Sequence, residues 1–189
     1  MLLETIRCEG GEAQHLSYHQ QRLNRSLHSL GIEKTYSLQT LITPPTEGLY
    51  RCRFLYDAEG YEIEFNPYTP KKITSLKLIH TEEIEYTLKY SNRDSLNTLL
   101  AQRGECDEVL IVKNGFLTDT TIANIALFIE GRWLTPDTPL LEGTTRARLI
   151  KDGFLTPAPL TPNDIARSCK VAVMNAMIGF VEVESGIIT

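Results

Sequence analysis

The stretch NGFLTDTTIANIALFI, residues 114–129, places a turn and a group of polar side chains directly before an apolar run. Asn-Gly is among the strongest short signals for a tight hairpin turn, so we expect strands at 108–113 and 122–129 that pair across it. Threonine and aspartate favour turns through local side-chain hydrogen bonds, and this interpretation suffices for the threonines. Asn124 is different, because it lies inside the apolar run, where a buried amide needs hydrogen-bonding partners.

Apolar patterns on either side of this stretch predict an α+β protein with two lobes. Residues 1–85 carry the patterns of a small N-terminal α+β lobe, and residues 86–189 those of a larger C-terminal lobe of mixed α/β structure. Alternation predicts strands, and leucines at helical spacing predict helices. The expected elements are strands at 2–8, 49–56, 61–68 and 73–80 with a helix at 18–30, then helices at 91–103, 144–151 and after Thr161-Pro162, with late strands at 171–174 and 181–183.

Composition excludes several classes of protein. The 189 residues carry a formal net charge of -5 without clusters of lysine and arginine, so the basic stripe of a nucleic-acid-binding protein is missing. The 4 cysteines lie far apart without a C-x-x-C pair, which argues against a structural metal site or a disulfide framework and favours free thiols. The start of the chain is unlike a signal peptide, and no apolar run approaches the ~20 residues that span a bilayer, so we expect a cytoplasmic protein without a membrane segment.

Two segments outside the central stretch have features of phosphate sites. Arg22 and Arg25 lie three residues apart on a predicted helix, and paired planar donors suit a phosphate dianion; an ordinary solvated helix face is the alternative. His19, on the same helix, is interpreted as a structural or capping residue. Residues 143–145, Gly-Thr-Thr, begin another predicted helix, whose backbone N–H groups attract anions; a simple threonine cap is the alternative.

Lys89 lies between Tyr86 and a predicted helix. A lysine that forms an imine needs a lowered pKa, which burial or a neighbouring cation provides. Taken alone, however, this segment fits a surface lysine better. Arg93 in the same segment either touches a ligand or pairs with Asp94, and we favour the ion pair.

In their order along the chain, these segments resemble the class IV aminotransferase family, the fold-type IV enzymes that use pyridoxal 5'-phosphate. The resemblance spans nearly the whole chain, and the ordered set is specific although each piece is common. The pieces are Leu3-Glu4-Thr5-Ile6-Arg7, His19-x-x-Arg22-Leu23-x-x-Ser26, Lys89, Gly115-x-Leu117-Thr118-Asp119 with Asn124-Ile125, Trp133-Leu134-Thr135-Pro136, and Leu141-x-Gly143-Thr144-Thr145-Arg146.

The resemblance implies a fold-type IV enzyme, with the cofactor between a shortened N-terminal lobe and the C-terminal lobe, that assembles as a homodimer. It implies that Lys89 is both the Schiff-base lysine and the proton-transferring catalyst. It pairs Asp119 with the pyridine nitrogen, although most members have glutamate there. The phosphate is implied to bind Arg22 and the start of the helix at 144. The implied cofactor-binding residues are Arg22, Lys89, Asp119, Asn124, Thr144 and Thr145.

The same residues serve two reactions in the family. Its aminodeoxychorismate lyases eliminate pyruvate from 4-amino-4-deoxychorismate and leave 4-aminobenzoate, whereas its aminotransferases, of the branched-chain or D-amino acid types, need a second, keto-acid substrate. The short N-terminal lobe leaves few places for a keto-acid loop, so we favour the lyase, acting on a small amino substrate. The aminotransferase is the alternative, and a catalytically silent binding domain of the same fold is a third. Asn175 fits either a place near the phosphate or the substrate, or a place in the core.

Overall fold

The computed structural model describes residues 1–184 and 186–188, and its contacts divide the chain into two compact units. The first unit holds Met1–Pro70 together with Leu88–Asn92, and the second holds Lys71–Thr87 together with Arg93–Thr189. The chain therefore passes between the units at three places along the sequence. Each unit combines strands with helices, so the predicted α+β class is confirmed.

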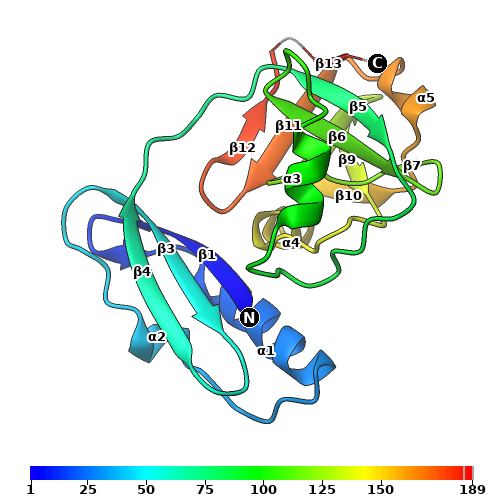
Figure 1. Ribbon diagram of the computed structural model, residues 1–189. Helices are drawn as coiled ribbons and strands as arrows, with labels where there is room; N and C mark the ends of the chain where they lie inside the picture. The colour runs from blue at the N-terminus through cyan, green and yellow to red at the C-terminus, as the bar shows by residue number, and fades with distance from the viewer. Residues whose placement is uncertain (185, 189) are drawn as a thin grey trace. The chain divides into compact units, whose positions relative to one another are not determined.

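A four-stranded antiparallel sheet in the order β2-β1-β3-β4 forms the first unit (Figure 1). The turn between β3 and β4 is closed by Asp57, whose Oδ1 accepts the N–H groups of Glu59 and Gly60 at 2.9 and 3.1 Å. The predicted hairpin and the predicted first helix are both present. The elements of this unit are β1 (Leu2–Glu9), β2 (Glu12–Ala13), α1 (Leu16–Ser29), α2 (Leu38–Leu41), β3 (Leu49–Tyr56) and β4 (Tyr61–Pro67).

Alternation along β1 decides which of its side chains enter the core of the first unit. Ile6 and Cys8 point to the buried face, where they join Leu23 and Leu27 of α1 in one hydrophobic cluster. The two leucines are four residues apart, so they form the apolar stripe of an amphipathic helix. Glu4 shares this alternating position and is also buried, at 0% exposed. A carboxyl group therefore lies in the layer between strand and helix.

The segment Leu88–Asn92 is part of the first unit because it adds to the edge of β1. The Lys89 carbonyl accepts the N–H of Leu3 at 2.9 Å, and Tyr90 forms an antiparallel bridge with Leu2. The lysine that the sequence singles out is thus held through its own backbone at the start of β1.

Two sheets form the second unit, in the orders β13-β5-β6-β7 and β10-β9-β8-β11-β12 (Figure 1). The pair β5–β6 is parallel, and β8 is antiparallel to both of its neighbours. The elements of this unit are β5 (Leu76–His80), α3 (Asp94–Leu100), β6 (Glu108–Lys113), β7 (Phe116–Leu117), β8 (Asn124–Ile129), β9 (Arg132–Pro136), α4 (Thr144–Lys151), β10 (Leu155–Ala158), α5 (Pro162–Ile165), β11 (Lys170–Asn175), β12 (Gly179–Glu182) and β13 (Ile187–Ile188).

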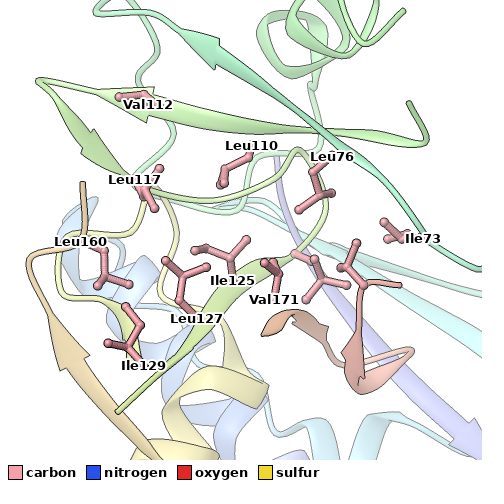
Figure 2. Close-up of a cluster of buried hydrophobic side chains, with 13 residues drawn as sticks. Ile73, Leu76, Leu110, Val112, Leu117, Ile125, Leu127, Ile129, Leu160 and Val171 are labelled. Atoms are coloured by element: carbon pink, nitrogen blue, oxygen red, sulfur yellow. The ribbon is translucent and has the colours of Figure 1, made fainter. Parts of the chain in front are cut away.

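The main core of the second unit lies between its two sheets (Figure 2). Leu110 and Leu117 enter it from the β6–β7 side, and Ile125 and Leu127 from β8, all four at 0% exposed. On the outer faces, α3 covers the sheet that contains β6, and α4 covers the sheet that contains β8. Alternate apolar residues of β6 and β8 therefore pack in this core, and the apolar residues between them, Val109, Ile111 and Ala126, pack under a helix.

Two expectations about the strands, the lobe of one and the partner of another, are wrong. Strand β5, expected in the N-terminal lobe, pairs with β6 in the second unit. Strand β8, expected to pair with β6 across the Asn-Gly turn, pairs with β9 and β11, and the hairpin partner of β6 is the short β7. Local alternation predicts that a strand exists, but its partner depends on the surfaces that distant residues bury. The helix expected at 91–103 is shorter and comprises only α3.

No helix within residues 1–184 and 186–188 is long and apolar enough to cross a membrane. Over the same residues, no group of three or more histidine, cysteine, aspartate or glutamate side chains is placed to hold a metal ion. The cysteines are free thiols; Cys8, Cys52 and Cys106 are buried, and Cys169 is exposed.

Leu127→Ala tests the core between the two sheets. Because Leu127 is fully buried, at 0% exposed, we expect its truncation to lower the free energy of unfolding by about 2–5 kcal/mol. Leu30, at 48% exposed, provides the control: Leu30→Ala should change the same free energy by no more than about 0.5 kcal/mol. Urea denaturation followed by circular dichroism measures both variants, and equal losses would contradict this description of the core.

Candidate active site

A buried carboxylate on β1 receives three hydrogen bonds from α1. Arg22 donates from Nε to Glu4 Oε1 at 2.8 Å and from Nη2 to Glu4 Oε2 at 2.5 Å. His19 Nδ1 lies 2.6 Å from Glu4 Oε2. His19 and Arg22 are three residues apart, so one face of the helix presents both to the strand. The three residues are 0%, 1% and 7% exposed for Glu4, His19 and Arg22.

The charges of this cluster compensate one another. Burial raises the pKa of Glu4, but the charge of Arg22 and hydrogen bonds from His19 and Arg22 outweigh burial, and the pKa falls to about 2. Burial is the largest influence on the pKa of His19, and although Glu4 raises this pKa, burial and the charges of Arg22 and Lys89 together lower it. His19 is therefore neutral near pH 7, and since an ionised carboxylate only accepts hydrogen bonds, its Nδ1 carries the proton.

Lys89 lies near this cluster within the first unit. Its side chain is half-buried. Its positive charge is one of the causes that lower the pKa of His19, which requires the two groups to be close. Of the residues predicted for the site, Arg22 and Lys89 are thus brought into one neighbourhood, together with Glu4 and His19.

A second buried carboxylate, Asp119, lies in the second unit between β7 and β8. Asn124 Nδ2 donates to Asp119 Oδ1 at 2.7 Å, and the Leu141 N–H donates to Asp119 Oδ2 at 2.9 Å. The same Asn124 amide group donates to the Leu141 carbonyl at 2.9 Å. Asn124 therefore has the partners that its place in an apolar run requires.

The partners of Asp119 leave its charge incompletely compensated. Burial raises its pKa most strongly, while hydrogen bonds from Leu141 and Asn124 and the charge of Arg146 lower it, and the pKa is raised to about 7. Arg146 Nη2 donates to the Pro136 carbonyl at 2.7 Å. A cation placed against the carboxylate would favour its ionised form. Asp119 therefore fits the protonated nitrogen of a pyridine ring.

The N-terminus of α4 fits an anion. A Cβ atom on Gly143 would lie 2.0 Å from Asn124 Oδ1, so only glycine is accommodated at this position. Gly143 is also the N-cap residue of α4, and no side chain caps the helix. The alternative of a threonine cap is therefore wrong, and the N–H groups of Thr144 and Thr145 suit a phosphate group.

Asn175 and Arg93 hold the loop that connects Asp119 to β8. Asn175 Nδ2 donates to the Ile122 carbonyl at 3.1 Å, and its Oδ1 accepts two backbone N–H groups of the β11–β12 turn at 2.9 and 3.0 Å. Arg93 Nη2 donates to the Thr121 carbonyl at 2.8 Å. Thr121 Oγ1 in turn donates to the buried Glu108 Oε2 at 2.7 Å. The sequence favours an ion pair between Arg93 and Asp94. In the structure, the Arg93 guanidinium instead donates to the backbone of this loop.

Sequence reasoning missed Glu4, which it treated only as part of an opening strand. The signal was present, because Glu4 is the one acidic residue on the inward alternating positions of β1. Arg25, expected to share a phosphate site with Arg22, is exposed while Arg22 is buried. His19 has the structural role expected of it, but it does not cap α1, whose N-cap is His15.

Comparison with known proteins identifies the family. Residues 57–185 match the model of the amino-transferase class IV family. A Haemophilus influenzae protein named "Uncharacterized protein" is 40% identical over 185 residues, which cover 94% of this chain and 98% of that protein. A Schizosaccharomyces pombe protein named "Putative aminodeoxychorismate lyase" is 36% identical over 74 residues, which cover 35% of this chain and 32% of that protein.

Solved structures share the fold over nearly the whole chain. A "putative 4-amino-4-deoxychorismate lyase" from Haemophilus somnus has a TM-score of 0.85 and 36% identity, covering 94% of this chain and 96% of the other. A "Putative amino-acid aminotransferase" from Mesorhizobium loti has a TM-score of 0.82 and 24% identity, covering 99% of both chains. The fold is therefore that of fold-type IV enzymes, and this chain is a short member.

Asp119→Asn tests the state of the buried carboxyl in the cofactor-free protein. Its pKa of about 7 lies above the usual value of 3.8, so the folded state binds the proton more tightly than the unfolded state. The free energy of unfolding should therefore fall by about 2–3 kcal/mol between about pH 5 and pH 7.5. Asp119→Asn should lose this part of the pH dependence. Urea denaturation at both pH values measures it.

The wild type and Asp119→Asn must be compared by how their free energies of unfolding change with pH, and not by their stabilities at one pH. The asparagine amide would place a donor against the Leu141 N–H, so Asp119→Asn loses stability at every pH. Equal pH dependence in the wild type and the variant would show that Asp119 does not titrate in this range.

Proposed function

Because the chain belongs to the class IV aminotransferase family, we propose that it is a pyridoxal-phosphate-dependent lyase that converts 4-amino-4-deoxychorismate into 4-aminobenzoate and pyruvate. The family uses pyridoxal 5'-phosphate. When bound, this cofactor supplies an electron-poor ring that accepts the electron pair of a breaking bond. The observation that carries the cofactor assignment is the buried Asp119 carboxyl, whose raised pKa of about 7 calls for a cationic partner.

Lys89 is the residue to which we assign covalent binding and proton transfer. Its Nζ would hold the cofactor through its aldehyde carbon, and the substrate amine would displace it from there. The freed amine then takes the proton from the amine-bearing carbon of the substrate. The C–O bond to the leaving group breaks, and the leaving group takes up a proton and departs as pyruvate. The backbone pairing of Lys89 with Leu3 holds the residue in place during these steps.

The remaining assigned residues would bind and orient the cofactor. Ionised Asp119 would keep the pyridine nitrogen protonated, because each charge favours the other. Arg22 provides planar N–H donors for the phosphate, and the N–H groups of Thr144 and Thr145 provide a second set. Asn124 holds Asp119 in place through its 2.7 Å hydrogen bond and does not react.

Similarity to proteins named as lyases supports elimination over amino-group transfer. The Haemophilus somnus protein shares 36% identity with this chain, and the Mesorhizobium loti protein, named as an aminotransferase, shares 24%. The Schizosaccharomyces pombe match also carries a lyase name. The aminotransferase is the second candidate, because the Mesorhizobium loti structure covers 99% of both chains.

We also propose that the chain assembles as a homodimer, as members of this family usually do. Light scattering coupled to size-exclusion chromatography measures the assembly, and a mass of 21.4 kDa in solution would mean a monomer.

Lys89→Ala tests the covalent role of the lysine. Wild-type protein incubated with pyridoxal phosphate should show a visible absorption band that borohydride abolishes, because hydride reduces the C=N bond to Lys89. Lys89→Ala should keep its circular dichroism spectrum, lose the reducible linkage and lose at least about 100-fold in turnover. Lys170→Ala, which removes an exposed lysine ion-paired to Glu182, is the control. A reducible linkage in Lys89→Ala would assign the role to another lysine.

A substrate experiment separates the two reactions. The protein loaded with cofactor is incubated with 4-amino-4-deoxychorismate alone, and pyruvate and 4-aminobenzoate are measured. The lyase proposal predicts equal amounts of both products without any keto acid. Turnover only with an amino acid and a keto acid together would assign the aminotransferase. A protein that takes up no pyridoxal phosphate would be a silent binding domain.

A further inference from the structure

Glu4 has no part in the reaction proposed above, yet its side chain is ionised and fully buried, at 0% exposed. Burying an ion pair costs free energy of desolvation, and a pair of apolar side chains of similar size is often at least as stable. The presence of this carboxylate between β1 and α1 is therefore poorly explained by stability. The hydrogen bonds of Glu4 to Arg22 and His19 indicate a role other than stability.

The two oxygens of Glu4 fix the plane of the Arg22 guanidinium. Nε and Nη2 donate to different oxygens, at 2.8 and 2.5 Å, which is a bidentate arrangement. A single hydrogen bond would let the planar group rotate about that bond, and two parallel bonds prevent it. The other N–H groups of Arg22 are therefore held in fixed directions.

His19 strengthens this arrangement without changing its charge. Its Nδ1 donates to Glu4 Oε2, the oxygen that also accepts from Arg22 Nη2. Because the pKa of His19 is lowered, mainly by burial, the imidazole adds a hydrogen bond but no second positive charge. The carboxylate is thereby held from α1 at two positions, 19 and 22, and Arg22 remains its principal cation.

We infer that Glu4 is a positioning residue that orients the Arg22 guanidinium for the phosphate group of pyridoxal phosphate before the cofactor binds. The inference rests on the proposed function, which assigns the phosphate to Arg22, and extends it to the residue behind that arginine. A side chain already held in its binding orientation loses little freedom when the ligand arrives, which increases affinity. The effect acts only on ligands that carry the phosphate.

Glu4→Gln and a pair of ligands test this inference. Glutamine keeps the shape of the side chain and one acceptor oxygen, but its amide nitrogen cannot accept the second hydrogen bond from Arg22. The dissociation constants of pyridoxal phosphate and of pyridoxal, which lacks the phosphate, are measured by spectroscopic titration. Glu4→Gln should raise the dissociation constant of pyridoxal phosphate by about 10-fold or more and change that of pyridoxal by less than about 2-fold. The preference for the phosphorylated ligand should fall accordingly.

Glu64→Gln is the matched control on the same sheet. Glu64 Oε2 accepts from Arg53 Nη1 at 2.6 Å, but the Glu64 side chain is 44% exposed. This variant should bind both ligands as the wild type does. Equal weakening of both ligands by Glu4→Gln, or no weakening of either, would assign Glu4 a structural role and overturn the inference. A wild type without preference for the phosphate would refute the proposed phosphate site itself, and the inference with it.

If Glu4→Gln does not fold, the wild type supplies the test. The NMR order parameter of the Arg22 Nε–H bond in cofactor-free protein should reach about 0.8, close to that of rigid backbone. Arg53, whose side chain is 31% exposed, should give a clearly lower value. An Arg22 guanidinium that is mobile until pyridoxal phosphate is added would overturn the inference.

Discussion

One amide group, that of Asn124, connects the two loops of the second unit that carry Asp119 and the start of α4. Its Nδ2 donates to Asp119 and to the Leu141 carbonyl, and its Oδ1 occupies the space where a Cβ of Gly143 would lie. The loop after β7 and the loop before α4 are therefore connected through one planar group. The position of the acid and the position of the helix N-terminus depend on each other because both contact the same side chain.

Two of the buried carboxylates, Glu4 and Asp119, differ in what neutralises them. Glu4 is paired with the guanidinium of Arg22 from the same unit, and its pKa falls to about 2. Asp119 has neutral amide donors as its nearest partners, and burial raises its pKa to about 7. A carboxylate that already has its cation serves to orient that cation. A carboxylate whose nearest partners are neutral is suited to a ligand that brings a positive charge.

Local features of the sequence predicted the main helices and strands well. The predictions that depend on contacts between distant residues were the ones that were wrong or missing. Helix α4 was predicted with its full extent, because its start and its charged last turn are local signals. The ordered motifs also predicted the family, which the match of residues 57–185 confirms. The lobe expected for β5 and the partner expected for β8 were wrong, because the local pattern of a strand is the same whichever neighbour it pairs with. The Glu4–Arg22 ion pair joins residues 18 positions apart, and no local pattern indicates such a contact.

The return of the chain to the first unit at Leu88–Asn92 has a consequence for recombination between relatives. A chimera that exchanged only Met1–Pro70 would pair β1 of one parent with the lysine-bearing segment of the other, across the Leu3–Lys89 hydrogen bond. A compatible exchange must carry this short segment along, although it is encoded between two stretches of the second unit. The segment Leu88–Asn92, which carries Lys89, must therefore come from the same parent as α1, whereas the stretches on either side of it belong with the second unit.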